Sequence, residues 1–371
     1  MIRVYCISAL LVLLNHCHLT EQSLDNEVKP LQLKSTLAKI EKSPSLTFIV
    51  SGDMQVDRND SFLSQAVISQ AMNRVQYAFS LDKNRKPVSG YWPWRLASGS
   101  KTRLANRGQK IAKPGFIMKV GDLTMHTFID EVKNYHRLYG ESPYEFSVNM
   151  PVFTGLGNHD IHRIHALKYL DLLFEPVQTE GFVYNRDSRN YTFETQYYMF
   201  IQLNEFGGKY GTKDLQWLKQ QLQRARKSRK KILIFQHYGL DDFSFCLNDA
   251  FANRVKTSDK CRWWNISQAR ALYKLLSQYE VVALFHGHWH VSGHCRWGKI
   301  PVFSAGGARD TADILLVRLD QNELHVAPVK YSGRGPQTVN TWFGKFFMGS
   351  WAFDDAKVCT FAGQTPRTII H

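Results

Sequence analysis

Side chains that can bind metal ions follow five short apolar segments of this sequence. These candidate ligands are Asp53, Gln55, Asp122, Asn158, His237, His288 and His290. Carboxylates and imidazoles together suit Zn²⁺, Mn²⁺ or Fe, and they suit a Ca²⁺ site of oxygen ligands much less well. One carboxylate shared between two ions about 3.5–4 Å apart makes a two-metal centre. The residue types therefore predict a site for two divalent or trivalent metal ions.

The segments that precede these residues have the character of short buried β-strands. They span residues 46–50, 116–120, 151–154, 231–235 and 281–285. In open α/β sheets, ligands bind outside the carboxyl ends of the strands. Five such strands, each followed by Asp, Asn or His, predict that polar side chains far apart in the sequence converge at one sheet edge.

The remaining pattern is that of an α/β protein. Helical spacing of apolar residues predicts helices over 61–79, 162–174, 212–226 and 268–279, and further strands are expected within 191–203, 301–304 and 312–319. The chain contains no internal repeat. A hydrophobic content of 44% fits a globular enzyme and excludes a largely disordered chain.

In five blocks the sequence resembles the calcineurin-like metallophosphoesterase superfamily, and the blocks occur in the family's order. They are Gly52-Asp53, Gly121-Asp122, Gly157-Asn158-His159-Asp160, His237 and Gly287-His288-Trp289-His290. The resemblance spans residues 53–290. It implies a four-layer α/β/β/α sandwich and hydrolysis of a phosphate mono- or diester by a hydroxide held between two metal ions.

The resemblance also implies a role for each matching residue. Six side chains would hold the ions: Asp53 and His290 the first, Asp122 both, and Asn158, His237 and His288 the second. His159 would lie near the phosphate, where it stabilises developing charge or protonates the leaving oxygen. Asp160 would orient His159.

Two positions depart from patterns within the superfamily. The first block usually reads Asp-x-His, whereas here it reads Asp53-Met54-Gln55. A glutamine can ligate through its amide oxygen, more weakly than an imidazole does, so Gln55 is either a weak ligand or no ligand. Purple acid phosphatases place a tyrosine where this chain has Met125, which argues against a tyrosinate-bound ferric centre.

The start of the sequence is typical of a secretory signal peptide. Arg3 precedes an apolar run over residues 4–14 that is too short to cross a bilayer comfortably. We expect a signal peptide over 1–20, an N-terminal lead over 21–44, the metallophosphoesterase domain over 45–330 and a C-terminal extension over 331–371 packed on it. An N-terminal anchor or a buried strand is the alternative to a cleaved leader. The predicted location is the secretory lumen or outside the cell.

Cysteine content and glycosylation sequons agree with this route. Four cysteines follow the leader region: Cys246, Cys261, Cys295 and Cys359. An even number suggests two disulfides with three possible connectivities, of which Cys246–Cys261 with Cys295–Cys359 is favoured, and four free thiols are the alternative. The sequons begin at Asn59, Asn190 and Asn265.

A net charge of +15 favours anionic partners. Residues 83–113 contain nine Lys or Arg and no acidic residue. This segment is predicted to contact an anionic polymer, membrane head groups or a phosphorylated substrate, or else to be a solvated loop. The chain has no nucleic-acid-binding motif, and its oligomeric state is open. The alternative to a secreted phosphoesterase is a secreted anion-binding protein on a catalytically weakened scaffold of the same family.

Overall fold

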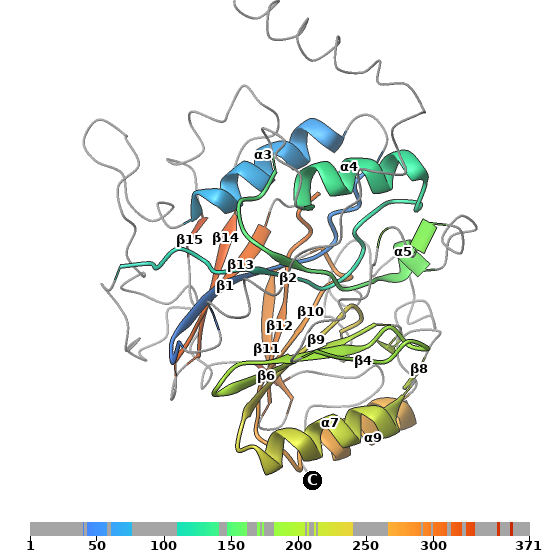
Figure 1. The fold of residues 1–371 in the computed structure, drawn as a ribbon, viewed down its shortest axis with the longest axis vertical. Coiled ribbons are helices and arrows are strands. Elements are labelled where there is room, and N and C mark those ends of the chain that lie inside the picture. Colours follow the sequence, from blue (N-terminus) through green and yellow to red (C-terminus); the bar gives the residue numbers. More distant parts are fainter. Residues whose placement is uncertain are drawn as a thin grey trace, which may run out of the picture.

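The computed structural model consists of four layers, in which two β-sheets face each other and helices cover the outer face of each (Figure 1). The mixed α/β sandwich predicted from the sequence is therefore confirmed. The structure describes residues 40, 43–57, 61–75, 110–140, 147–161, 169–170, 173, 182–204, 206–207, 211–212, 214–239, 266–290, 292–297, 300–309, 313–320, 324–330, 347–348 and 357–358.

The first sheet has six strands. In spatial order they are β15 (Phe347–Met348), β14 (Leu324–Lys330), β13 (Asp313–Leu319), β1 (Leu46–Ser51), β2 (Ile117–Lys119) and β3 (Val152–Phe153). Strands β1, β2 and β3 are parallel, with Ile49 opposite Ile117 and Ile117 opposite Val152. Because they run the same way, the turns after them meet at one edge of the sheet.

The second sheet has eight strands. In spatial order they are β16 (Lys357–Val358), β11 (Gly293–Trp297), β12 (Ile300–Ser304), β10 (Val281–His286), β9 (Lys231–Gln236), β6 (Tyr198–Leu203), β5 (Tyr191–Glu194) and β4 (Val183–Tyr184). Its central strands β12, β10, β9 and β6 are parallel. A separate ribbon pairs β7 (Phe206–Gly207) with β8 (Gly211–Thr212).

Helices form the outer layers. On the first sheet lie α3 (Ser61–Asn73) and α4 (Ile129–Tyr139), and on the second lie α7 (Leu215–Lys227) and α9 (Ile266–Leu276). The short α5 (Asn158–Ile161) follows β3. In α7, Leu218 and Leu222 are buried one turn apart and pack with Met199 of β6.

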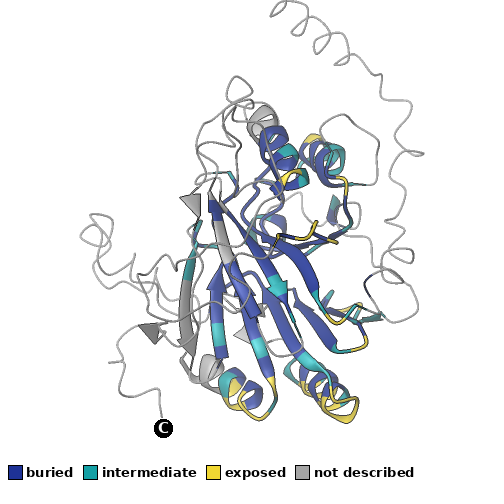
Figure 2. Ribbon diagram, turned by 90° about the vertical axis from the view of Figure 1, so that its left-hand side faces the viewer, coloured by how far each residue is buried: buried dark blue, intermediate teal, exposed yellow. Residues whose placement is uncertain are grey.

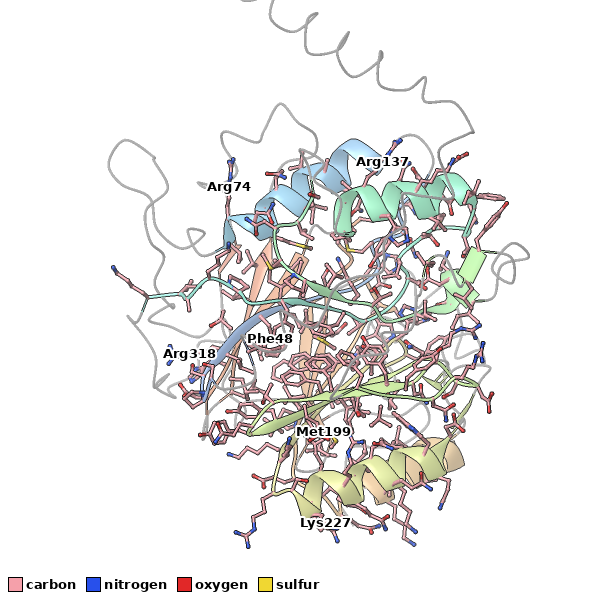
Figure 3. The ribbon with its side chains drawn as sticks, viewed as in Figure 1. Phe48, Arg74, Arg137, Met199, Lys227 and Arg318 are labelled. Carbon is pink, nitrogen blue, oxygen red and sulfur yellow. The ribbon has the colours of Figure 1, made fainter. Side chains whose placement is uncertain are left out.

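An aromatic core fills the space between the sheets. The Phe48 ring stacks on that of Phe116 with centroids 4.9 Å apart, and it meets Phe200 of the second sheet edge-on at 5.8 Å. Figure 3 shows Phe48 between the sheets and Met199 toward α7. Both sheets are buried along most of their described length (Figure 2). Aromatic pairs at these distances attract beyond their burial, so the sheets are held in a fixed relation.

Most predicted elements occur where the sequence placed them, and one differs. Residues 191–203 form two strands rather than one, because the chain turns at Thr195, whose hydroxyl accepts the N–H of Tyr198 at 3.1 Å. Helix α4 and strands such as β11 and β14 were not predicted, although Val132, Tyr135 and Leu138 of α4 recur on one buried face. Most of the helix expected over 162–174 lies outside the described residues.

Several further predictions fall on residues that the structure does not describe. They include the signal peptide, most of the N-terminal lead, residues 83–109 of the basic segment, Cys246, Cys261, Cys359 and the sequons at Asn59 and Asn265. In the C-terminal extension, β15 pairs with β14 and β16 pairs with β11. Within the described part of the chain, no helix has the length and apolarity to cross a membrane.

The sequon at Asn190 is not available in the folded protein. Asn190 is 0% exposed, and its side-chain oxygen accepts the N–H of Asn204 at 2.7 Å. A glycan at this nitrogen would have to occupy the protein interior. Burial therefore argues against glycosylation at this sequon.

Candidate metal centre

The predicted ligands lie on tight turns at the carboxyl ends of β1, β2, β3, β9 and β10. Five of them have positive φ values: Asp53 (52°), Gln55 (42°), Asp122 (53°), His288 (76°) and His290 (57°). Residues other than glycine rarely adopt this left-handed conformation, which costs free energy and clusters at functional sites. The turns therefore orient these side chains at a cost in free energy, because the backbone conformation is unfavourable.

Glycines allow the turns to approach one another closely. A Cβ at Gly157 would collide with the carboxylate of Asp122, and one at Gly287 would lie 2.8 Å from Asp53 Oδ2. Gly121 has a φ of 98°, and a Cβ there would lie 2.7 Å from His237 Nδ1. In three of the predicted motifs, the residue before the candidate ligand is thus glycine because a side chain there would clash with a neighbouring turn.

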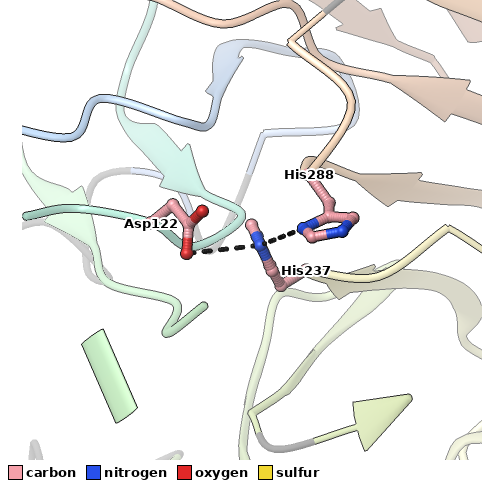
Figure 4. Close-up of side chains that lie close together, drawn as sticks. All are labelled: Asp122, His237 and His288. Carbon is pink, nitrogen blue, oxygen red and sulfur yellow. Dashed lines mark hydrogen bonds and ion pairs between the residues drawn. The ribbon is translucent and has the colours of Figure 1, made fainter. Parts of the chain in front are cut away.

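One group of donor atoms surrounds the Nε2 atom of His237. This atom lies 3.1 Å from His288 Nδ1 and 3.3 Å from Asp122 Oδ1 (Figure 4). It also lies 2.9 Å from Asn158 Oδ1. The other ring nitrogen, Nδ1, is 2.9 Å from the carbonyl oxygen of Val120. A donated N–H at Nδ1 fixes the imidazole so that Nε2 faces the group, an arrangement common around bound metals.

A second group shares Asp122 and adds Asp53 and His290. The ligand atoms of these three residues lie within 4.8 Å of one another, and His290 Nε2 is 3.4 Å from Asp53 Oδ1. Both oxygens of Asp53 accept the backbone N–H of His288 at 2.9 Å. The turn that carries the two histidines is therefore bonded directly to the turn that carries Asp53.

Gln55 lies against this second group, but with its amide nitrogen facing the group. Its Nε2 atom is 3.3 Å from Asp122 Oδ2 and 3.4 Å from His290 Nε2. Its Oε1 atom accepts a hydrogen bond from Arg309 at 3.2 Å. Only the oxygen can ligate a metal ion, and it is turned away. In this conformation Gln55 is a hydrogen-bond donor to the group, and ligation would require the amide to turn over.

His159 and Asp160 have different partners from those that the sequence suggested. His159 Nδ1 is 2.8 Å from the carbonyl oxygen of Met125, and its Nε2 atom is 4.0 Å from Asp122 Oδ2. The carboxylate of Asp160 accepts the N–H groups of Leu123, Thr124 and Gly157 at 2.9–3.0 Å. The interpretation that Asp160 orients His159 is thus corrected: the Met125 carbonyl orients the ring, and Asp160 holds the two turns together.

Opposite charges dominate the electrostatics of the group around His237. Burial disfavours charge on both partners, yet the Asp122 carboxylate raises the pKa of His237 to about 9. For Asp122, burial alone would raise the pKa, but the charge and hydrogen bond of His237 and the charge of His159 hold it below its usual value. Without a metal ion, the two residues form a buried ion pair at neutral pH.

At the neighbouring groups, burial has a larger effect on the pKa than the nearby charges do. It raises the pKa of Asp53 to about 6 against the positive charge of His290. It also raises the pKa of Asp160 to about 7, aided by the nearby Asp122 charge and opposed by the backbone donors. Burial, followed by the charge of His237, holds the pKa of His288 well below its usual value. His288 is therefore neutral and able to ligate.

The donor set fits a pair of metal ions. Bonds of about 2.0–2.1 Å place neighbouring ligand atoms roughly 2.8–3.4 Å apart, from octahedral to tetrahedral geometry. The separations around His237 Nε2 are 2.9–3.3 Å, and His290 and Asp53 are 3.4 Å apart. The Asp122 carboxylate belongs to both groups. The predicted ligands thus meet in one place. Gln55 lies there too, but it presents its amide nitrogen and not the oxygen that could ligate.

Other residues near the motifs have packing roles or lie outside the described part. Tyr238 is buried, with its ring 4.6 Å from that of His288. His126 is partly exposed and lies edge-on to Phe128. Arg58 and Arg163 are not among the described residues. Arg309, which lies beside Gln55, was not predicted from the sequence. It follows β12 after a Gly-Gly turn, and this pattern of strand, turn and arginine could have indicated a residue near the site.

The chain belongs to the calcineurin-like phosphoesterase family. The family model matches residues 46–292, more than half of the chain, and strands β11 to β14 follow the matched part. Membership indicates a metal-dependent hydrolase, and the two donor groups that share Asp122 agree with it. Among curated proteins, none matches this chain.

Solved structures with a similar fold are distant in sequence. GAP50, the anchor in the inner membrane complex of Plasmodium, is 14% identical, and the match covers 78% of this chain and 85% of that chain with a TM-score of 0.48. A dimetal phosphatase from Danio rerio is 12% identical, with 84% and 100% covered and a TM-score of 0.46. These are likenesses in fold alone.

Metal binding should release a proton from His237 and strengthen as the pH rises. Below a pKa of about 9 the imidazolium must lose its proton before Nε2 can ligate, so the apparent affinity should rise by up to about tenfold per pH unit and level off above pH 9. Titration calorimetry with Mn²⁺ in two buffers between pH 6.5 and 9.5 measures both effects. The variant His325→Gln, in β14 away from the site, should behave like the parent. A pH-independent affinity would contradict the assignment.

Replacing Asp160 should lower the stability of the folded protein. Asp160→Asn puts an amide N–H₂ group where an oxygen accepts backbone N–H groups, which should cost about 1–3 kcal/mol of unfolding free energy. Urea unfolding of the metal-free protein measures the loss. Exposed Asp130→Asn, in α4, serves as the control and should change stability by less than about 0.5 kcal/mol. An Asp160→Asn protein as stable as its parent would refute the positioning role.

Proposed function

We propose that this protein hydrolyses a phosphate ester at a dinuclear metal site. The observation that carries the proposal is the sharing of one buried carboxylate, Asp122, by two groups of metal-ligating atoms. Asp53, Asp122 and His290 would hold one ion, and Asp122, Asn158, His237 and His288 the other. Zn, Mn and Fe all suit this donor set. When bound, such an ion pair activates water for in-line attack and offsets charge on the phosphoryl oxygens.

The protein's own residues would position the reacting groups. Asp160 keeps the turns of Asp122 and Asn158 at a fixed distance through its bonds to Leu123 and Gly157. The Val120 carbonyl holds the ring of His237. Side chains held in place by such contacts need no rearrangement during the reaction, and this preorganisation is a large part of electrostatic catalysis.

His159 is the proposed general acid. Its Nδ1 atom is engaged by the Met125 carbonyl, so Nε2 is the nitrogen that can give a proton to a leaving oxygen. The side chain is 18% exposed, whereas Asp122 is 1% exposed. The imidazole therefore lies at the solvent side of the donor groups, where a substrate's leaving group would pass.

Removing the shared carboxylate should abolish activity. Asp122→Asn takes away the anionic bridge, and since metal ions contribute several kcal/mol to such reactions, turnover of an aryl phosphate should fall at least about a thousand-fold. Kinetics with added Mn²⁺ or Zn²⁺, together with elemental analysis, measure the loss of rate and of bound metal. The matched control is Asp320→Asn, a carboxylate paired with Arg318 in a different part of the structure.

Two results would count against the proposal. Full metal-dependent activity in Asp122→Asn would refute the assignment of the site. A parent protein that binds no metal, hydrolyses no phosphate ester and binds tightly to an anionic matrix would favour the alternative, an anion-binding protein on a weakened scaffold. The net charge of +15 is compatible with both functions.

We also propose that the protein enters the secretory pathway. The support is the apolar run over residues 4–14 after Arg3, together with an even number of cysteines after the leader region. Expression of the full chain in cultured eukaryotic cells should yield a product in the medium whose N-terminus, by peptide sequencing, begins near residue 20. Retention in the cytosol with Met1 intact would reject the proposal.

A further inference from the structure

Positive charge is concentrated at the end of α7, at the edge of the second sheet opposite the metal centre. Six of the eight residues over 224–231 are Lys or Arg. They close α7 and lead into β9, whose six residues run about 20 Å from this segment to the turn that carries His237. A partner bound at the end of α7 would therefore leave the metal centre uncovered.

One acidic residue neutralises part of this charge. Glu194 of β5 pairs with Arg224 at 2.6 Å and also with Lys230. The next acidic residue nearby, Glu280, is exposed and forms no ion pair with a cation of the described residues. The contacts of Glu194 thus account for two cations of the segment and leave others free.

The unpaired cations form one surface over α7 and α9. They are Lys219, Arg226, Lys227, Arg229 and Lys274, which together we call the basic surface. All five are exposed, and in the described part of the chain none of them forms an ion pair. Lys227 lies on the outer side of α7 (Figure 3). Arg226 donates to the carbonyl oxygen of Gln278, whose side chain donates to that of Lys274, both at 2.7 Å, so the ends of the two helices lie side by side.

The backbone at Arg229 is unfavourable for an arginine. Its N–H donates to the carbonyl oxygen of Arg226 at 3.1 Å, and the N–H of Lys230 donates to that of Ala225 at 2.9 Å. This is the Schellman motif, in which the first residue after the helix is left-handed and is usually glycine. Arg229 has a φ of 55° there. Because glycine would adopt this conformation at lower cost, the fold does not explain the arginine side chain.

The helix dipole explains some of these cations but not the whole basic surface. Arg226 and Lys227 lie in the last turn of α7, where positive charge is favourable. Lys219 lies two turns earlier on the same face of the helix, and Arg229 lies outside the helix. Neither α7 nor α9 contains an acidic residue. Two adjacent helices thus present positive charge without the alternating signs of an ordinary solvated face.

The other exposed side chains of α7 are polar. They include Gln216, Gln220 and Gln223, whereas Leu218 and Leu222 are buried against the second sheet. A helix that binds a membrane surface inserts apolar side chains into the interface, and α7 has none to offer on its outer face. Cations with amides between them suit a polymer that carries anionic groups and hydroxyls along its length.

Aromatic stacking is also not available on this surface. Trp217, Tyr273 and Tyr279 are partly buried and pack against the apolar cluster between the helices and the second sheet. The guanidinium of Arg226 lies 4.2 Å over the Tyr279 ring. Single-stranded nucleic acids are held largely by stacking of bases on aromatic side chains, so they fit this surface less well than a polysaccharide does.

We infer that the basic surface, formed where the end of α7 meets α9, binds a sulfated polysaccharide. Clusters of Lys and Arg of this length are typical of heparin-binding segments. The bound polymer would hold the protein in place while the metal centre stays open to its substrate. The inference goes beyond the proposed function and does not require that the protein is an enzyme.

The test removes three unpaired cations of the basic surface from the full chain. The variant Lys219→Gln/Lys227→Gln/Arg229→Gly is compared with Arg74→Gln/Lys133→Gln/Arg186→Gln, which loses the same net charge elsewhere on the structure. The single variant Arg229→Gly tests the left-handed position. Calorimetry measures the binding of heparin and of desulfated heparin at several salt concentrations, and a thermal scan measures stability.

We expect the basic-surface variant to bind heparin roughly 10- to 100-fold more weakly than the parent, with a shallower salt dependence, because a few-fold is lost with each cation. The charge-matched control should change by less than about threefold, since distant surface charges are screened. Desulfated heparin should bind the parent at least about tenfold more weakly than heparin. Equal losses in both triple variants would overturn the inference, because net charge alone would then explain the binding.

Arg229→Gly separates binding from folding. It should weaken heparin binding by roughly three- to tenfold. Its midpoint of thermal unfolding should be no lower than that of the parent, because glycine suits the left-handed position. Unchanged heparin binding in this variant would contradict the role of Arg229 and overturn the inference.

Two further measurements decide the partner and the relation to the metal centre. Vesicles of phosphatidylserine, or single-stranded DNA, that bind the parent more tightly than heparin does would overturn the choice of polysaccharide. Saturating heparin should leave turnover of an aryl phosphate within about twofold, because the basic surface and the metal centre lie at opposite edges of the sheet. A parent without turnover would contradict the proposed function alone, and heparin binding would still decide this inference.

Discussion

The site depends on one buried carboxylate, which needs hydrogen-bond donors and positive charge from several directions. Asp122 is 1% exposed, and an unpaired charge at such a position would be very costly. Its oxygens meet the backbone N–H of His159 at 2.8 Å, His237 Nε2 at 3.3 Å and Gln55 Nε2 at 3.3 Å. These partners come from three turns and both sheets, so the requirements of a single side chain join the two halves of the sandwich.

The packing of the two sheets therefore determines the geometry of the site. The first sheet supplies Asp53 and Asp122 and the second supplies His237 and His288, while the stacked rings of Phe48 and its neighbours set the spacing between the sheets. Close approach of the turns needs glycines and left-handed backbone, both of which weaken local structure. A rigid core holds these unfavourable turns in place, as preorganised sites require.

The two donor groups are not equivalent. The group around His237 contains two imidazoles, an amide oxygen and the shared carboxylate. The other has one imidazole, and Gln55 presents its amide nitrogen there because Arg309 binds the oxygen. Fewer ligands and a nearby positive charge both weaken cation binding. We expect the group of Asp53, Asp122 and His290 to hold its ion less tightly than the group around His237.

The sequence by itself determined the five strands that precede the candidate ligands, the order of the motifs and which residue types could meet at the sheet edge, because a short apolar run followed by polar residues is a local pattern. It did not reveal α4, the turn at Thr195, the partners of Asp160, the orientation of the Gln55 amide, the burial of Asn190 or the place of Arg309. Apart from α4 and the turn at Thr195, whose signals are local, each of these depends on a neighbour far away in the sequence, such as Met125 beside His159. Local patterns carry no information about which atoms face each other across two packed sheets, and only the tertiary structure decided that.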